Sequence, residues 1–130
     1  MDFKYSAAPL AFISGHSMTT LRNDSTGWLG IKITIGAGDI VVTQLGRWVV
    51  PGNTGSHTVK LVHAATGTDV ASATVTTLGA PVGQFQYTPL TSAVTLAAHT
   101  SYYLVSQETA GGDYWYDFHQ AAAGSATGYQ

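Results

Sequence analysis

The stretch VVTQLGRWVVPGNTGSHTVKLVHA, residues 41–64, decides the predicted fold of this chain. Two runs rich in valine and leucine flank the loop PGNTG at residues 51–55. β-Branched and aliphatic residues favour strands, whereas proline, glycine and asparagine favour turns. The pattern therefore predicts a β-hairpin, and we expect the rest of the fold to take its register from this pair of strands.

Outside this stretch, several segments alternate between apolar and polar residues. Residues 28–35 place Leu29, Ile31, Ile33 and Ile35 on one face, which predicts a half-buried strand with an isoleucine-rich core face. Further strands are predicted at residues 10–13, 70–77, 84–88, 94–96, 101–108 and 113–118. No segment has a helical period, so we predict an all-β fold, an antiparallel β-sandwich or jelly roll of about eight or nine short strands.

The length of 130 residues fits one domain with a single core. We expect the core to span residues 10–119 and the small, polar residues 120–130 to be linker-like. The first residues lack the apolar segment of a signal peptide. We therefore interpret the chain as one module cut from a longer polypeptide.

Composition narrows the range of partners. Only 9% of the residues are charged and the formal net charge is −2, so no basic field is present to hold nucleic acid. No apolar run approaches the ~20 residues that cross a bilayer, so no membrane partner is expected. Cysteine is absent, which excludes disulfides, thiolate zinc sites and cysteine nucleophiles. Low charge with 15 glycines and 11% aromatic residues is typical of secreted β-domains, and we expect an extracellular location.

The acidic residues give little support to a catalytic function. Of the seven, Asp24, Asp39 and Asp69 lie in turn clusters, which account for them. The carboxylates that could converge are those of Glu108, Asp113 and Asp117. No G-x-S-x-G motif marks an activated nucleophile, so we expect no enzymatic activity and no required cofactor.

The same three carboxylates have other interpretations. Acidic side chains gathered in a glycine-containing loop suit a hard cation, so a structural calcium ion at Glu108, Asp113 and Asp117 is one alternative to solvated acids. The chain has no EF-hand spacing. If Arg47 faces inward, it needs a carboxylate partner, and the same three residues are the candidates.

Aromatic residues provide the better functional candidates. If the face that contains Leu45 is core, Trp48 points outward beside the glycine-rich loop, and Trp115 lies among consecutive aromatic residues that cannot all face inward. An indole ring covers the apolar face of a sugar while amides and imidazoles bond its hydroxyls. The alternative is that both tryptophans belong to the core, and Trp28 is a weaker candidate. The expected polar partners are Asn53, His57, Glu108 and Asp113.

Three segments carry a resemblance to a known family: GNTGSHTVKL at 52–61, ATGTDV at 65–70 and LAAHTSYYLV at 96–105. With them, residues 28–116 resemble a bacterial domain family of unknown function that occurs in extracellular proteins beside carbohydrate-active enzymes and immunoglobulin-like repeats. The resemblance implies a secreted, noncatalytic β-sandwich that binds glycan. It supplies no ligand residues to transfer.

These observations predict a carbohydrate-binding module that targets a covalently tethered catalytic domain to polysaccharide or oligosaccharide. The predicted platforms are Trp48 and Trp115. The alternative is a structural spacer or adhesion domain of a secreted multidomain protein.

Overall fold

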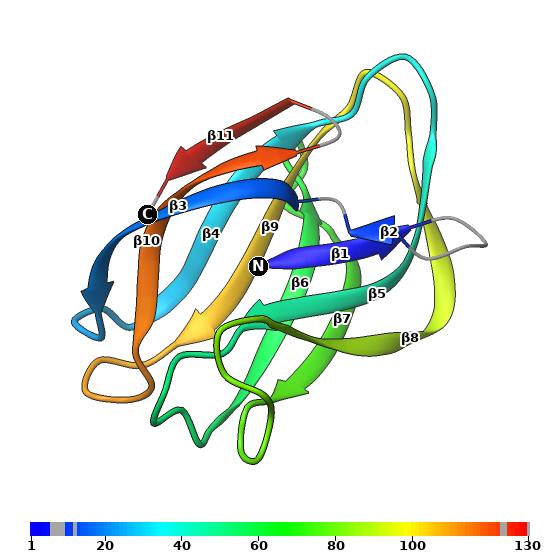
Figure 1. The fold of residues 1–130 in the computed structure, drawn as a ribbon. Coiled ribbons are helices and arrows are strands. Elements are labelled where there is room, and N and C mark those ends of the chain that lie inside the picture. The colour runs from blue at the N-terminus through cyan, green and yellow to red at the C-terminus, as the bar shows by residue number, and fades with distance from the viewer. Residues whose placement is uncertain (6–9, 12, 123–124, 130) are drawn as a thin grey trace.

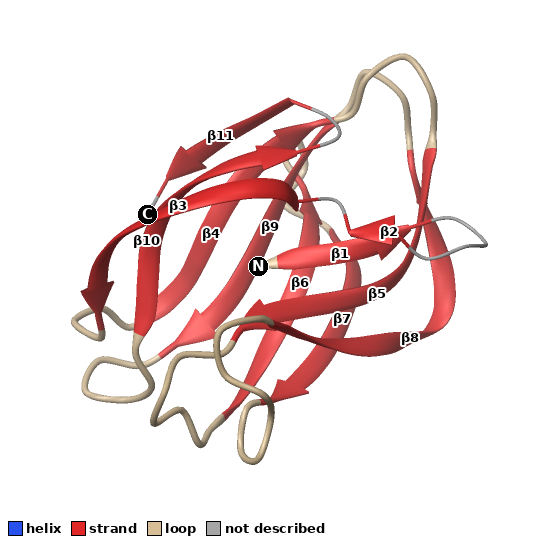
Figure 2. Cartoon of the chain, in the orientation of Figure 1, coloured by secondary structure: helices blue, strands red, loops and turns tan. Residues whose placement is uncertain are grey.

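The structure is a computed structural model that describes the backbone of all residues except 6–9, 12, 123–124 and 130, and the side chains of residues 1–5 and 20–116. Among the described residues there are strands and loops and no helix, hence none that could cross a membrane (Figure 2). The strands are β1 (Asp2–Tyr5), β2 (Leu10–Ala11), β3 (Ile13–Arg22), β4 (Gly27–Thr34), β5 (Ile40–Trp48), β6 (Ser56–His63), β7 (Asp69–Thr76), β8 (Phe85–Leu96), β9 (Ser101–Glu108), β10 (Trp115–Ala122) and β11 (Ser125–Tyr129).

The strands form antiparallel sheets in two layers, so the predicted all-β sandwich class is confirmed (Figure 1). One layer is a five-stranded sheet with the order β11-β4-β9-β6-β7. A four-stranded sheet, β2-β1-β5-β8, and a two-stranded sheet, β10-β3, lie over it. At one edge the Thr88 hydroxyl of β8 donates to the Thr74 carbonyl of β7 at 2.9 Å, which joins the two large sheets.

The predicted hairpin of residues 41–64 is wrong, because its two strands belong to different sheets. Strand β5 pairs with β1 and β8, whereas β6 pairs with β7 and β9. Residues 49–55 therefore cross from one layer to the other. The apolar faces that contain Leu45 and Val59 are both fully buried in one core cluster, on either side of the sandwich rather than side by side in one sheet.

The core is built from the inward faces of both large sheets. The isoleucines of the predicted face are buried, Ile31 and Ile33 in β4 and Ile35 just after it, while Leu29 of the same face is half-buried. Phe3 of β1 and Leu104 of β9 are completely buried in the same cluster. Each such side chain contributes about 1.5–3 kcal/mol relative to an exposed position.

Strand β8 is a single strand where the sequence predicted two short ones. Pro89 was expected to interrupt it, because proline cannot donate to a ladder. Among the described strands β8 pairs only with β5, and Pro89 lies opposite Gln44 beside a shift in register. An edge position and a bulge are the two places where a strand accepts proline.

Both ends of the chain contain strands that the sequence did not reveal. Strand β1 lies before the expected core boundary at residue 10, and Phe3 pairs with Leu45 of β5. Strand β11 lies within residues 120–130, which were expected to be linker-like, and it pairs with β4. The small and polar residues of β11 have little strand propensity, so the strand is recognised only from its pairing with β4.

Candidate ligand-binding site

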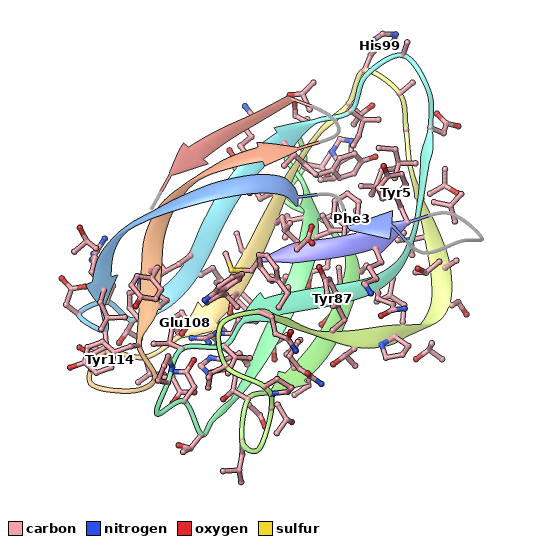
Figure 3. All side chains as sticks on the ribbon, in the orientation of Figure 1. Phe3, Tyr5, Tyr87, His99, Glu108 and Tyr114 are labelled. Carbon is pink, nitrogen blue, oxygen red and sulfur yellow. The ribbon has the colours of Figure 1, made fainter. Side chains whose placement is uncertain are left out.

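The candidate site lies at the end of the sandwich where two loops meet. The loop of residues 49–55 leads from β5 into β6, and the loop of residues 109–114 leads from β9 into β10 (Figure 1). Glu108 and Tyr114 are labelled at this end in Figure 3. The neighbouring side chains form a polar network that ties the two layers together.

At the centre of the network, Arg47 of β5 forms an ion pair with Glu108 of β9. The Arg47 Nε donates to Glu108 Oε2 at 3.0 Å, and Nη2 donates to Oε1 at 2.9 Å. Both side chains are only 3% exposed. The Ser106 hydroxyl also donates to Glu108 Oε2, at 2.6 Å. The expectation that an inward Arg47 would need a carboxylate is confirmed, and Glu108 supplies it.

The rest of the Arg47 guanidinium holds the two loops. Its Nη1 donates to the side-chain oxygen of Asn53 at 2.8 Å and to the Trp48 carbonyl at 2.9 Å. The Asn53 oxygen also accepts from the Val50 amide, and the Asn53 Nδ2 donates to the Tyr114 carbonyl at 3.2 Å. One asparagine therefore folds its own loop and binds the neighbouring one.

A second pair, His57 and Asp113, lies beside this network. The His57 Nε2 is 2.7 Å from Asp113 Oδ2, and the backbone amides of Thr54 and Gly55 donate to the same carboxylate at 3.0 and 2.8 Å. The Thr77 hydroxyl donates at 3.2 Å. Burial by itself would raise the pKa of Asp113, but the hydrogen bonds from His57 and the two amides outweigh burial and lower this pKa to about 2.

Each ring nitrogen of His57 faces a hydrogen-bond acceptor. Its Nδ1 lies 3.0 Å from the Gln107 carbonyl and 3.3 Å from Glu108 Oε2, while Nε2 faces Asp113. Carbonyl and carboxylate oxygens only accept hydrogen bonds. A ring with a proton on each nitrogen would donate to both of these partners.

A pocket of about 350 Å³ opens next to this pair. Loop residues and the ends of β6 and β9 form its wall, which consists of Thr54, Gly55, Ser56, His57, Gln107, Thr109, Gly112 and Asp113. Half of the eight wall residues, Thr54, Ser56, Gln107 and Thr109, have neutral polar side chains. Hydroxyl and amide groups of this kind bind uncharged polar ligands through hydrogen bonds.

Trp28 of β4 is paired with Gln107, a residue of the pocket wall. It lies directly opposite Gln107 in the β4–β9 ladder, and its side chain is 39% exposed. The Lys60 ammonium lies 4.0 Å from the centre of the indole ring and also pairs with Asp69 at 3.1 Å. Trp28 is therefore a cross-strand neighbour of one wall residue, Gln107, in the five-stranded sheet.

The pocket loop is held from its other side as well. The Gly111 amide donates to the Asn23 carbonyl at 2.7 Å, and the Asn23 side chain donates to the Gly112 carbonyl at 3.2 Å. The Ala110 amide donates to the Thr26 hydroxyl at 2.9 Å. Hydrogen bonds therefore hold residues 109–114 to residues 23–26 on one side and to Asn53 on the other, so this wall of the pocket does not depend on a ligand for its shape.

The structure brings the four predicted polar residues together but buries three of them, Asn53, His57 and Glu108. Asn53 and His57 are 8% exposed and Glu108 is 3% exposed, and their hydrogen bonds are made within the protein. Only His57 and Asp113 reach the pocket wall. The open arrangement expected for Asn53 and Glu108 is not what the structure has, because the Arg47 guanidinium must be neutralised and bonded once it is buried.

The two predicted platforms are half-buried. The face that contains Leu45 is core, so Trp48 lies on the opposite face as expected, where its ring packs edge-to-face against Phe85 at a centroid distance of 5.1 Å. The buried Nε1 of Trp115 has no hydrogen-bond acceptor among the described residues. Trp28 is the tryptophan with an exposed ring among the described side chains.

The sequence already indicated the outward position of Trp28. Alternation along residues 28–35 places Trp28 opposite the isoleucine face, and hence outward. The pairing of Trp28 with Gln107, a residue of the pocket wall, depends on the strand order, which the sequence does not give. For Thr54, Ser56 and Thr109, by contrast, no sequence pattern indicated a place in a binding site.

A metal site finds no support in the described part of the chain. Among those residues, no group of three or more histidine and acidic side chains is placed to hold an ion. Oxygen atoms of Glu108 and Asp113 accept hydrogen bonds from Arg47 and His57. The Asp117 side chain lies outside the described residues, so a calcium ion stays a prediction.

No family model, curated protein or solved structure matches this chain. The resemblance of residues 28–116 to a bacterial extracellular domain family therefore stays a prediction from the sequence pattern.

Proposed function

We propose that this protein is a noncatalytic carbohydrate-binding module whose binding site is the polar pocket with Trp28 at its rim. One observation carries the proposal. The exposed indole of Trp28 lies directly opposite Gln107, which lines the pocket. Stacking on an indole beside amide and hydroxyl groups is the combination that suits a sugar ring.

The rigidity of the site supports binding without induced folding. Residues 109–114 are bonded to residues 23–26 on one side and to the loop of residues 49–55 on the other. A ligand therefore does not have to order these loops, which saves part of the entropy cost of binding.

The contact area is small, so we expect a dissociation constant in the millimolar to micromolar range, which corresponds to a binding free energy of about 4–8 kcal/mol. Tethering to a second binding or catalytic domain would raise the effective affinity.

The roles of the described carboxylates favour binding over catalysis. Glu108 is buried in its pair with Arg47, and Asp113 holds two backbone amides and His57. A general acid or base needs a carboxyl group within reach of the reacting bond and a pKa suited to proton transfer. Neither carboxylate has that freedom, because Glu108 neutralises the buried Arg47 and Asp113 is held by His57 and two backbone amides.

The proposal is tested by retention on a panel of insoluble polysaccharides and by a glycan array. Trp28→Ala is expected to abolish retention, while Trp48→Ala, on the opposite layer, is expected to keep it. Thermal melting of both variants checks that they fold. If Trp48→Ala abolishes retention and Trp28→Ala does not, the binding site lies on the four-stranded sheet, and the proposed pocket is wrong. If the folded wild-type protein is retained on no glycan, the module is a spacer or adhesion domain instead.

A further inference from the structure

We infer that the pocket receives one sugar unit at the end of a neutral glycan, while the next unit lies on the Trp28 indole. This inference rests on the proposed carbohydrate-binding function and adds the charge class of the ligand and the way it enters. Three features of the pocket carry it: its size and position, its unengaged polar groups and its charge balance.

The size and position of the pocket indicate a chain end. Its volume of about 350 Å³ is at the lower limit for small-molecule pockets, ~300–1,000 Å³. The loops that contain Thr54 and Gly112 form part of its wall, and both leave the ends of strands. Gln107 and Trp28 lie on adjacent strands, which are ~4.8 Å apart. A second unit linked to the one in the pocket would therefore meet the indole.

Three polar side chains of the wall are available to a ligand. The Gln107 amide and the hydroxyls of Thr54 and Thr109 make no side-chain hydrogen bond with any other described residue, and all three residues are exposed. The Ser56 hydroxyl is engaged with Thr76 at 3.0 Å. Together the available groups can donate to and accept from sugar hydroxyls on one side of the pocket.

The charges around the pocket favour a neutral ligand. Asp113 contributes a carboxylate to the wall, and both ring nitrogens of His57 already face carboxylate oxygens, those of Asp113 and Glu108. The nearby cations Arg47 and Lys60 are each paired, with Glu108 and Asp69. A uronic acid would therefore lose hydration on entering and find no unpaired basic side chain in the described wall. A neutral sugar carries no such penalty.

The experiment compares matched ligands and matched variants by calorimetry or NMR titration. A neutral glycan that binds in the array is measured as a di-, tri- and hexasaccharide, alongside the same chain with its C6 alcohols oxidised to carboxylates. Affinity is expected to level off at the disaccharide or trisaccharide. The oxidised chain is expected to bind at least tenfold more weakly, at low and high salt alike.

The pocket itself is tested by filling it. Thr109→Trp places a bulky ring in the wall and is expected to lower affinity at least tenfold. Its matched control, Ala110→Trp, alters an adjacent exposed residue outside the wall and is expected to leave affinity unchanged. Melting curves check that both variants fold.

The outcomes separate this inference from the proposed function. If Trp28→Ala abolishes binding while Thr109→Trp does not, the protein binds glycan on the indole alone and the pocket inference is overturned. Equal binding of the oxidised chain overturns the charge argument, and affinity that keeps rising to the hexasaccharide overturns the chain-end argument. Absence of binding to every glycan overturns the proposed function as well.

Discussion

Arg47 and Glu108 join the two layers of the sandwich through a two-point ion pair buried at one end. Arg47 belongs to the four-stranded sheet and Glu108 to the five-stranded sheet. The same guanidinium also bonds Asn53 and the Tyr114 carbonyl, so it holds two loops of the candidate site. A change at this pair therefore affects both the stability of the fold and the shape of the pocket.

Glu108→Gln is expected to destabilise the protein strongly. Arg47 would keep its charge in a buried position without a charged partner, which costs about 3–5 kcal/mol. Urea denaturation measures the loss. The double variant Arg47→Met/Glu108→Leu removes both charges and is expected to be more stable than Glu108→Gln alone. A double variant as unstable as the sum of its two single variants would mean that the two side chains act independently.

His57 is expected to carry protons on both ring nitrogens. The carbonyl of Gln107 and the carboxylate of Asp113 lie on opposite sides of the ring and only accept hydrogen bonds. Nitrogen-15 NMR of the imidazole at mildly acidic pH distinguishes a doubly protonated ring from either neutral tautomer. His63, on the same strand and with Thr66 beside its Nδ1, serves as the internal comparison. A neutral tautomer at His57 would contradict the assignment.

Asp113 is expected to make stability depend on pH in the acid range. Its pKa is lowered in the folded protein from the ordinary value of 3.8 to about 2, so the unfolded chain takes up its proton first as the pH falls. The stabilisation is therefore present in full above 3.8 and is lost as the pH falls toward 2. Denaturation measured across this range should show the loss. Asp113→Asn is expected to have a flatter dependence, and an unchanged dependence would assign the effect to other groups.

Gly55 is expected to tolerate no larger residue. A Cβ at this position would lie 2.9 Å from Asp113 Oδ2 and 3.3 Å from His57 Nε2, so Gly55→Ala must displace the pair. We expect a loss of about 1–3 kcal/mol, typical of overpacking. Gly36→Ala is the control, because a Cβ there has open space. It is expected to be neutral or slightly stabilising through a smaller unfolded-state entropy. Equal stability of the two variants would contradict this role for Gly55.

Local patterns in the sequence determined the strand content and much of the core. Side chains alternate across a strand whatever its neighbours are, so the burial of Ile31, Ile33 and Ile35 and the outward position of Trp28 followed from the alternation along residues 28–35. The need of an inward Arg47 for a carboxylate also followed from the sequence, because the cost of burying a charge does not depend on the fold.

Only the tertiary structure decided which strands are neighbours. Every strand offers the same backbone donors and acceptors, so residues 41–64 could predict two strands and a turn but not that β5 and β6 would join different sheets. That choice depends on burying two apolar faces against each other across the core. It also buried Asn53, His57 and Glu108 in one polar network with Asp113, and it paired Trp28 with the distant Gln107 of the pocket wall.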